Sequence, residues 1–255
     1  MDAPMRDFRD EVPRSMSPID PPKARRCVQS RTLWIVLAVA GCGLALLLLG
    51  SETLERATQA LDERVLRALR RSDNPARLVG PAWLKRVAFD LTALGSPAVI
   101  VLAVVLALGH LLLARRGVAA TTICLSTAGA FALTASLKWF FDRARPSVVP
   151  PLAAASGGSF PSGHAALSAA VYLTMAALLA GEAPNPSARR FMLAAGALVT
   201  LLVGATRVLI GVHYPSDVLA GWVLGSAWAL LCSAVSRRWR KSRASVPGCG
   251  PRVEP

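Results

Sequence analysis

The sequence has little charge for its length. Only 17% of its 255 residues are Asp, Glu, Lys or Arg, whereas 53% are hydrophobic, and a soluble domain usually carries about 25% charged residues. The uncharged residues form long runs, which exclude an ordinary soluble domain and indicate a protein that spans a membrane. Lys and Arg outnumber Asp and Glu by 29 to 15. Because the basic residues flank the apolar runs and form no stripe with interleaved aromatic residues, we exclude nucleic acid as a partner.

Cysteine is scarce and shows no pairing pattern. The five cysteines are odd in number and form no Cys-x-x-Cys pair, so they predict neither a disulfide framework nor a metal site: Cys27, Cys42, Cys124, Cys232 and Cys249. Residues 39–42 look like a lipoprotein cleavage box. However, the apolar run continues past Cys42 to Gly50, which argues against a removed signal peptide. Neither an HExxH motif nor a cluster of carboxylates occurs, so we expect no metal and no cofactor.

Six apolar runs account for nearly half of the chain. The first, at 32–51, has 20 uncharged residues, which as a helix would span ~30 Å, the thickness of a bilayer's hydrocarbon core. The others are 91–114, 117–137, 165–181, 191–206 and 218–236. We therefore predict an all-α polytopic membrane protein with six transmembrane helices in a domain over 32–236. The flanks are a proline-rich disordered tail at 1–31 and a basic tail at 237–255.

The polar segment 52–90 separates the first two runs. Its apolar residues recur at three- and four-residue spacing, which predicts an amphipathic helix, with an apolar face of Leu54, Ala57, Leu61, Val65 and Leu69. The expected polar face is Glu55, Asp62, Glu63 and Arg70. We expect this helix to lie on the membrane surface, and Trp83 to mark the interface where the chain returns to the bilayer. The segment is either a cap over a functional site or a connector.

The basic residues predict the orientation. An even number of spans puts both termini on one side, together with Arg115, Arg116, Arg189 and Arg190. That side carries 17 Lys and Arg and the other side 12. Because cytoplasmic loops are enriched in Lys and Arg, we expect both termini to be cytoplasmic and the segment 52–90 to be extracytoplasmic.

Three polar clusters stand at the ends of apolar runs, at 138–146, 161–164 and 206–217. Ionisable residues at such positions are costly and usually functional. The predicted topology brings all three clusters to the extracytoplasmic surface. His110, by contrast, lies in the second run with only a basic pair nearby, and we expect it to be structural.

The clusters resemble the three-part signature of the type 2 phosphatidic acid phosphatase family, which are integral-membrane lipid phosphate phosphatases. The first part is Lys138, six residues, and Arg145-Pro146. The second is Pro161-Ser162-Gly163-His164. The third is Arg207, five residues, His213, three residues, and Asp217. One departure is Thr206, which keeps the hydroxyl of the serine that usually precedes the arginine in this family.

The same residues suit phosphoryl transfer on chemical grounds. The transition state of phosphoryl transfer carries negative charge on the non-bridging oxygens. The protein therefore mainly positions the phosphate and neutralises its charge. Lys138, Arg145 and Arg207 would supply three positive charges, and the arginines can bind phosphate bidentately. Ser162 suits a helix N-cap and Gly163 lets the backbone approach a ligand, so a helix N-terminus would add free N–H groups to the phosphate site.

Two histidines and a carboxylate would carry the reaction. His213 is the candidate nucleophile, and Asp217 would accept the hydrogen bond from its second ring nitrogen. His164 is the candidate general acid for the leaving group, which predicts a bell-shaped pH profile.

We therefore expect a membrane phosphatase that removes a terminal phosphate from a lipid on the extracytoplasmic face through a phosphohistidine. The resemblance implies undecaprenyl pyrophosphate, phosphatidic acid or phosphatidylglycerol phosphate as substrate, and the sequence does not choose among them. The alternative is a lipid-phosphate binding or transport protein without turnover. The vanadate-dependent haloperoxidases share this phosphate pocket, but they are soluble proteins, which argues against that class of enzyme here. The oligomeric state stays open.

Overall fold

The computed structural model describes residues 41, 43 and 52–244, and within this part of the chain the fold is all-helical. The helices are α2 (Glu52–Ala68), α3 (Trp83–Ala93), α4 (Pro97–Leu113), α5 (Gly117–Phe141), α6 (Gly163–Ala180), α7 (Pro186–Ile210) and α8 (Pro215–Ala244). The all-α prediction is confirmed for these residues. The predicted tail at 1–31 and nearly all of the predicted first span at 32–51 lie outside the described residues.

Four helices of the described part are long and apolar enough to cross a membrane, namely α5, α6, α7 and α8. Helices α3 and α4 make a fifth span only if they are taken together, because they are bent by 47° at a short break. The described residues thus supply up to five spans, and the predicted total of six is not confirmed.

The prediction of one helix across 91–114 was wrong, because the chain breaks between α3 and α4. Ser96 caps the new helix by accepting a hydrogen bond from the Val99 amide at 3.4 Å, and Pro97 occupies its first turn, where a missing N–H costs nothing. The break also places Gly95 against α7. A Cβ atom there would lie 2.3 Å from Cγ1 of Val203, so only glycine permits this approach.

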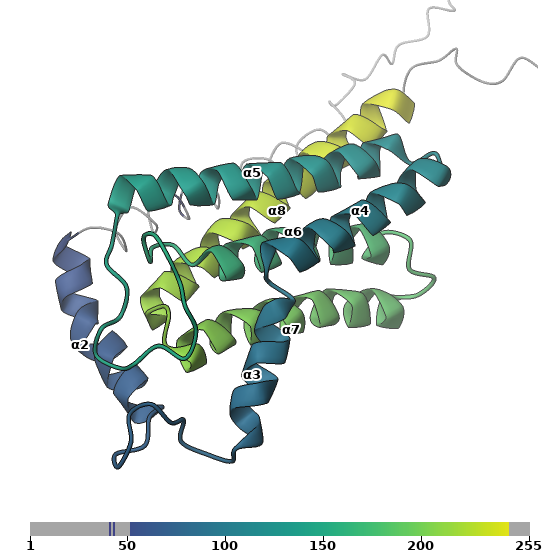
Figure 1. Ribbon diagram of the computed structural model, residues 1–255. Helices are drawn as coiled ribbons and strands as arrows, with labels where there is room; N and C mark the ends of the chain where they lie inside the picture. The colour runs from purple at the N-terminus through teal and green to yellow at the C-terminus, as the bar shows by residue number, and fades with distance from the viewer. Residues whose placement is uncertain (1–40, 42, 44–51, 245–255) are drawn as a thin grey trace, which may run out of the picture. The chain divides into compact units, whose positions relative to one another are not determined.

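Helix α6 lies at the centre of the bundle and packs against α4, α5, α7 and α8 (Figure 1). Small residues allow these contacts to be close. At the crossing of α6 and α8, a Cβ atom on Gly225 would come within 2.2 Å of the Ala166 carbonyl oxygen. Close backbone approach at small residues is the usual packing mode of helices in a bilayer.

The connections divide between the two ends of the bundle. The α5–α6 loop, the α7–α8 turn, α2 and α3 lie at one end, and the α4–α5 and α6–α7 connections lie at the other (Figure 1). Helix α8 runs past Ser236, where the sixth apolar run ends, to Ala244. The first part of the predicted basic tail is therefore helical, and residues 245–255 lie outside the described part.

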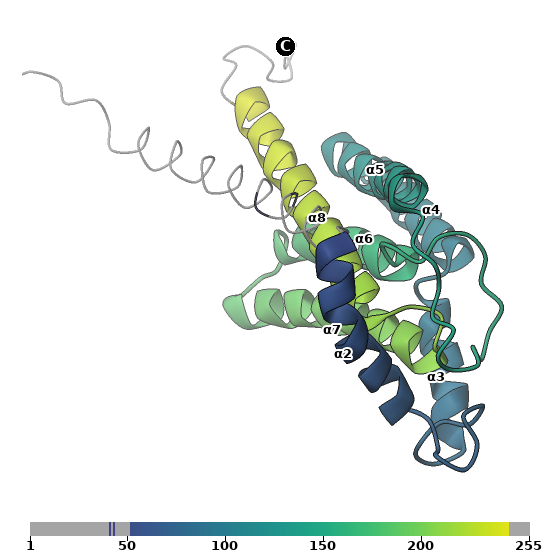
Figure 2. The same ribbon diagram turned by 90° about the vertical axis from the view of Figure 1, so that its left-hand side faces the viewer.

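Helix α2 packs on the bundle through a face that the sequence did not predict. Leu61, expected on the apolar face, is 62% exposed, whereas Asp62 and Leu66, and Arg70 two residues after the helix ends, are at most 5% exposed. Figures 1 and 2 show α2 beside the ends of α7 and α8. The buried face is partly ionic because its two charged side chains have hydrogen-bond partners on α7, on α8 and in the α5–α6 loop.

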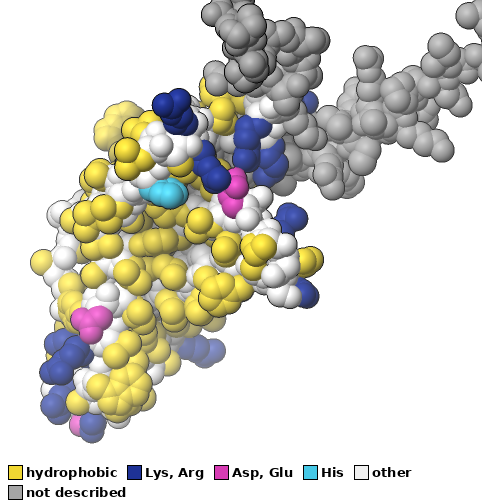
Figure 3. Space-filling model, turned by 90° about the vertical axis from the view of Figure 1, so that its right-hand side faces the viewer, with side chains coloured by type: hydrophobic (Ala, Val, Ile, Leu, Met, Phe, Trp, Pro, Cys, Tyr) yellow, Lys and Arg dark blue, Asp and Glu magenta, His cyan; other side chains and the backbone are white. Residues whose placement is uncertain are grey.

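The outer surface of the bundle supports a multi-pass membrane protein. Large apolar side chains such as Leu106, Leu113 and Leu198 are more than half exposed. On the face drawn in Figure 3, hydrophobic side chains cover the middle, and Lys and Arg gather towards the two ends. A soluble protein rarely exposes so much contiguous apolar surface, whereas a bilayer would cover it.

Candidate active site

The three polar clusters meet at the end of the bundle that carries α2. Lys138 lies in the last turn of α5, Arg207 in the last turn of α7, and Asp217 in the first turn of α8. Ser162 is the N-cap residue of α6. Its backbone N–H donates to the Asp217 carbonyl at 2.9 Å and so joins the starts of α6 and α8.

The turn between α7 and α8 presents His213. Gly211 ends α7 with a φ of +79°, a left-handed conformation that glycine adopts without strain. Pro215 then begins α8, and Oδ2 of Asp217 accepts a hydrogen bond from the Tyr214 amide at 2.9 Å. This is the geometry of a capping box, in which a side chain in the first turn reaches back to the N-cap amide. The fold of the turn therefore brings the carboxylate beside His213.

His213 is buried between a carboxylate and a guanidinium. Its Nδ1 lies 3.5 Å from Oδ2 of Asp217, and its Nε2 lies 3.4 Å from Nη1 of Arg145. Burial lowers the pKa of His213 to about 4, which outweighs the opposite effect of Asp217. The imidazole is therefore neutral at neutral pH, with one nitrogen free to act as a nucleophile. A contact of 3.5 Å is long for a hydrogen bond, and such contacts often tighten when substrate binds.

The three predicted phosphate-binding cations differ in their surroundings. Arg145 donates to the carbonyls of Val212 at 2.8 Å and Ser156 at 2.8 Å, so it also orders the α5–α6 loop. Lys138 Nζ donates to the Gly158 carbonyl. Arg207 donates through Nη1 to Thr92 Oγ1 at 3.1 Å, and its buried Nε has no partner among the described residues.

The start of α6 contributes further polar groups. His164 lies within electrostatic range of Arg207, His213, Lys138 and Arg145. Ser162 occupies the predicted N-cap position, but its hydroxyl makes no capping bond and is buried without a partner in the described part of the chain. Next to it, a Cβ on Gly163 would lie 3.8 Å from Cε of Lys138. The unpaired Ser162 hydroxyl and Arg207 Nε are hydrogen-bonding groups that an anion could satisfy.

Comparison with known proteins identifies the family. Residues 119–241 match the model of the PAP2 superfamily. Phosphatidylglycerophosphatase B of Bacillus subtilis is 30% identical over 202 residues, which cover 78% of this chain and 95% of the relative. The chain belongs to the PAP2 superfamily.

Two further relatives agree with this membership of the PAP2 superfamily. Lipid A 1-phosphatase of Rhizobium etli is 30% identical over 181 residues, which cover 62% of this chain and 74% of the relative. Among solved structures, the transmembrane PAP2-type phosphatidylglycerolphosphate phosphatase of Bacillus subtilis superposes with a TM-score of 0.70 at 28% identity. That match covers 78% of this chain and 96% of the crystallised one.

Sequence reasoning missed three buried polar residues of this PAP2 chain. Arg143 donates through Nη1 to Oδ1 of Asp217 at 2.7 Å and to Oγ of Ser216 at 2.8 Å. Asp62 accepts from the Ser216 amide at 3.0 Å. Arg143 lies inside the first part of the signature and Ser216 inside the third, so their positions hinted at a role. Nothing local distinguished Asp62 from the other acidic residues of its segment.

No group of three or more His, Cys, Asp or Glu side chains that could hold a metal occurs in the described part of this PAP2 chain. The metal-free mechanism stays a prediction.

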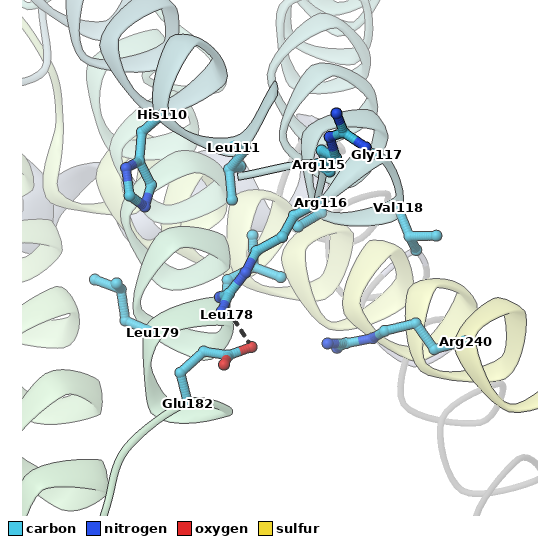
Figure 4. Close-up of a pocket in the computed structure, with 11 residues that line it drawn as sticks. His110, Leu111, Arg115, Arg116, Gly117, Val118, Leu178, Leu179, Glu182 and Arg240 are labelled. Carbon is cyan, nitrogen blue, oxygen red and sulfur yellow. Dashed lines mark ion pairs between the residues drawn. The ribbon is translucent and has the colours of Figure 1, made fainter. Parts of the chain in front are cut away.

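A pocket of about 400 Å³ lies at the end of the bundle away from the site, and none of the predicted site residues lines it (Figure 4). Arg115, Arg116 and Arg240 line it, and the side chain of Arg116 extends to Glu182, with which it pairs at 3.1 Å. His110 also lines this pocket, where no predicted site residue accompanies it. Basic side chains therefore mark the end of the PAP2 bundle opposite the polar clusters.

Proposed function

We propose that this PAP2 chain hydrolyses the terminal phosphate of a membrane lipid through a phosphohistidine on His213. That the chain is a lipid phosphate phosphatase rests on its family and on relatives named phosphatidylglycerophosphatase, lipid A 1-phosphatase and undecaprenyl-diphosphatase. The observation that carries the mechanism is the burial of His213 between Asp217, 3.5 Å from Nδ1, and Arg145, 3.4 Å from Nε2.

The first step forms the phosphoenzyme. The phosphate dianion lies among Lys138, Arg145 and Arg207, whose charges offset the negative charge on its oxygens. The lone pair of His213 Nε2 attacks phosphorus, and the bond from phosphorus to the lipid oxygen breaks. His164 donates a proton to that oxygen, so the lipid leaves as an alcohol or, from a diphosphate, as a monophosphate. The Nδ1 proton stays on the ring and is held by Asp217.

The second step returns the enzyme to its starting state. A water oxygen attacks phosphorus while His164, now neutral, takes the water proton. The bond between phosphorus and Nε2 breaks, and its electron pair returns to the imidazole. Inorganic phosphate leaves, and His164 is again protonated. The sum is one lipid phosphate and one water converted to a dephosphorylated lipid and phosphate.

The substrate class is a lipid with a terminal phosphate. The site lies at the end of an apolar bundle, so a lipid can present its head group there while its acyl or prenyl chains stay in the bilayer. The names of the relatives support phosphatidylglycerol phosphate, lipid A and undecaprenyl diphosphate as the substrates to test. Phosphatidic acid belongs in the same panel because it presents the same terminal phosphate.

We also propose that the site faces away from the cytoplasm. Arg115, Arg116 and Arg240 line the pocket at the end of the bundle away from the site, and Arg189, Arg237 and Arg240 line a second pocket beside the α6–α7 connection. Lys and Arg concentrate on the cytoplasmic side of membrane proteins, which favours the opposite, extracytoplasmic side for His213.

Covalent labelling tests the reaction. Purified protein in detergent micelles is given a lipid monophosphate labelled with ³²P, quenched within milliseconds, and analysed for acid-labile, alkali-stable label. We expect label on wild type and none on His213→Ala. With His164→Ala, we expect label to persist when the substrate has a good leaving group. Undiminished label on His213→Ala would refute the assignment of the nucleophile.

Turnover and vanadate separate an enzyme from a binding protein. Release of phosphate in catalytic excess over protein is expected for at least one lipid of the panel. Vanadate should inhibit because it mimics the trigonal bipyramidal phosphorus that the three cations stabilise. Stoichiometric binding of every lipid without phosphate release would instead support the lipid-phosphate carrier.

A further inference from the structure

Three buried residues in and just after helix α2 contact the turn that carries His213, which we call the catalytic turn. Asp62 and Leu66 are four residues apart on one face of α2, and Arg70 follows two residues after the helix ends at Ala68. Their exposed fractions are 3%, 0% and 5%. Figures 1 and 2 show this helix beside the end of α7 and the start of α8, the two helices that the His213 turn connects. Each of the three residues meets a different part of that turn.

Asp62 holds the start of α8. Its Oδ1 accepts from the Ser216 amide at 3.0 Å, and its Oδ2 accepts from the Ser216 hydroxyl. The first amides of a helix have no partner within the helix, and their partial positive charge favours a carboxylate. A side chain 154 residues away in sequence therefore supplies a cap to the helix that carries Asp217.

Arg143 connects Asp62 to the carboxylate behind the nucleophile. One terminal nitrogen donates to Oδ1 of Asp217 at 2.7 Å, and the other lies 3.4 Å from Oδ2 of Asp62. The guanidinium also stacks on the ring of Tyr214, with its carbon 4.6 Å from the ring centroid. All four residues are buried. Asp217 thus has Oδ1 bound to Arg143, which leaves Oδ2 to face Tyr214 N and His213 Nδ1.

Arg70 and Leu66 complete the contact with the turn. Nη1 of Arg70 donates to the carbonyl of Leu209 at 2.9 Å, in the last turn of α7, where a cation suits the carbonyl end of the helix. Leu66 packs in one apolar cluster with Tyr214 and Val149. Helix α2 therefore places a carboxylate on the start of α8 and an apolar side chain against the turn, and Arg70, just after the helix, places a guanidinium on the end of α7.

We propose that α2 is a clamp on the catalytic turn, and that Asp62 and Arg143 are positioning residues that fix the carboxylate of Asp217 behind His213. The proposal rests on the proposed function, because it gives these residues their role through the nucleophile. It assigns the segment 52–90 a part in the reaction, so the segment is more than a connector. Neither residue touches the phosphate site directly.

The clamp has an electrostatic consequence that a purely mechanical support would lack. Asp62 and Arg143 carry opposite charges near His213, so removing them should shift its pKa in opposite directions. Loss of Arg143 removes a positive charge and raises the pKa of His213, whereas loss of Asp62 leaves Arg143 uncompensated and lowers it. Among the described residues, the charged or titratable groups around His213 are Asp62, Glu63, Arg70, Lys138, Arg143, Arg145, His164, Arg207, Tyr214 and Asp217. Glu63 is partly exposed and paired with Arg67, so its charge is largely offset.

The test uses Asp62→Asn and Arg143→Gln in the full-length protein in detergent, with a lipid phosphate that wild type turns over. We expect kcat to fall about 10- to 100-fold in both variants, the usual loss when a partner that orients a functional ligand is removed. KM should change less than about twofold, because neither residue binds substrate. The acid limb of the pH profile of kcat/KM should move up by about one pH unit in Arg143→Gln, and down in Asp62→Asn.

Matched controls separate positioning from folding. Glu63→Gln and Arg67→Gln alter an i, i+4 ion pair on the exposed side of the same helix and should leave kcat and the acid limb unchanged. Arg143→Lys keeps the charge but loses the two-pronged donor, so it should lose kcat while its acid limb stays near that of wild type. Thermal denaturation in the same detergent identifies any variant that fails to fold.

The outcomes for the clamp and for the proposed function differ. A wild-type enzyme that never labels on His213 refutes the proposed function, whatever the α2 variants do. If wild type labels normally but Asp62→Asn matches Glu63→Gln in kcat and acid limb, the clamp is refuted and the mechanism stands. Acid limbs that move in the same direction in Asp62→Asn and Arg143→Gln would also overturn the charge argument.

Discussion

Replacing Asp217 by asparagine should nearly abolish turnover while leaving the bundle folded. The side chain keeps its shape, and it is fully buried in the native protein. In the native protein, Oδ1 of Asp217 accepts a hydrogen bond from Arg143 at 2.7 Å, and Oδ2 accepts one from the Tyr214 amide at 2.9 Å. Oδ2 also lies 3.5 Å from Nδ1 of His213. The side-chain amide of asparagine has only one acceptor oxygen. It can accept either from Arg143 or from the Tyr214 amide and His213 Nδ1, but not from both sets of donors.

The size of the loss follows from the two possible orientations of the new side-chain amide in Asp217→Asn. If its nitrogen faces Arg143, two donors oppose each other, and the buried guanidinium loses one of its two carboxylate partners, which costs up to about 3–5 kcal/mol. If the amide nitrogen faces Tyr214 and His213 instead, it donates a hydrogen bond to Nδ1 of His213. This stabilises the tautomer that carries its proton on Nε2, which has no lone pair there to attack phosphorus. In the Ser-His-Asp triad, the corresponding change costs about 10⁴-fold in kcat. We expect a loss of about 10³- to 10⁴-fold, or about 4–5.5 kcal/mol in the barrier.

The assay is phosphate release from a lipid monophosphate in mixed micelles, together with the rate of phosphoenzyme formation in a single turnover. Both rates should fall together, because Asp217 acts on the first step. Asp142→Asn is a matched control, since Asp142 is exposed at the same end of the bundle and has a left-handed conformation that asparagine tolerates. A variant of Asp217 that retains more than about a tenth of wild-type kcat would refute the reasoning.

Three further outcomes follow from the structure. Burial holds the pKa of His213 at about 4 against an ordinary 6.5, so between these pH values the unfolded chain binds more protons than the folded protein. The free energy of unfolding should therefore fall by up to about 3 kcal/mol as the pH is lowered from 6.5 to 4. Thermal denaturation of wild type should show this loss, and His213→Gln should show less of it. Gly225→Ala, which places a methyl group against α6, should destabilise the protein by about 1–3 kcal/mol, and Gly109→Ala, which meets nothing within 4 Å, should not. In a cysteine-free background, Ser156→Cys should react with an impermeant thiol reagent in intact cells and Ser187→Cys only after lysis, and the reverse pattern would place the site in the cytoplasm.

Most of the spanning helices and the three-part signature could be predicted from the sequence alone. Long uncharged runs are costly in water and require internally bonded backbone in a bilayer, so they predict spanning helices without any knowledge of packing. Turn chemistry is equally local, and Gly211 and Pro215 mark the end of α7 and the start of α8 in both the sequence and the structure. The spacing of four residues from His213 to Asp217 likewise depends only on that turn. For these reasons the candidate catalytic residues could be named in advance.

The burial of the charged residues in and just after α2 depends on tertiary contacts. By periodicity Asp62 and Arg70 belonged on the polar face, and that interpretation was wrong because their partners Ser216, Arg143 and Leu209 lie far away in the sequence. Likewise, the break at Gly95 fits the approach of Val203 from another helix. Local patterns rank residues by their average cost of burial, whereas the actual cost depends on a partner that only the folded chain supplies.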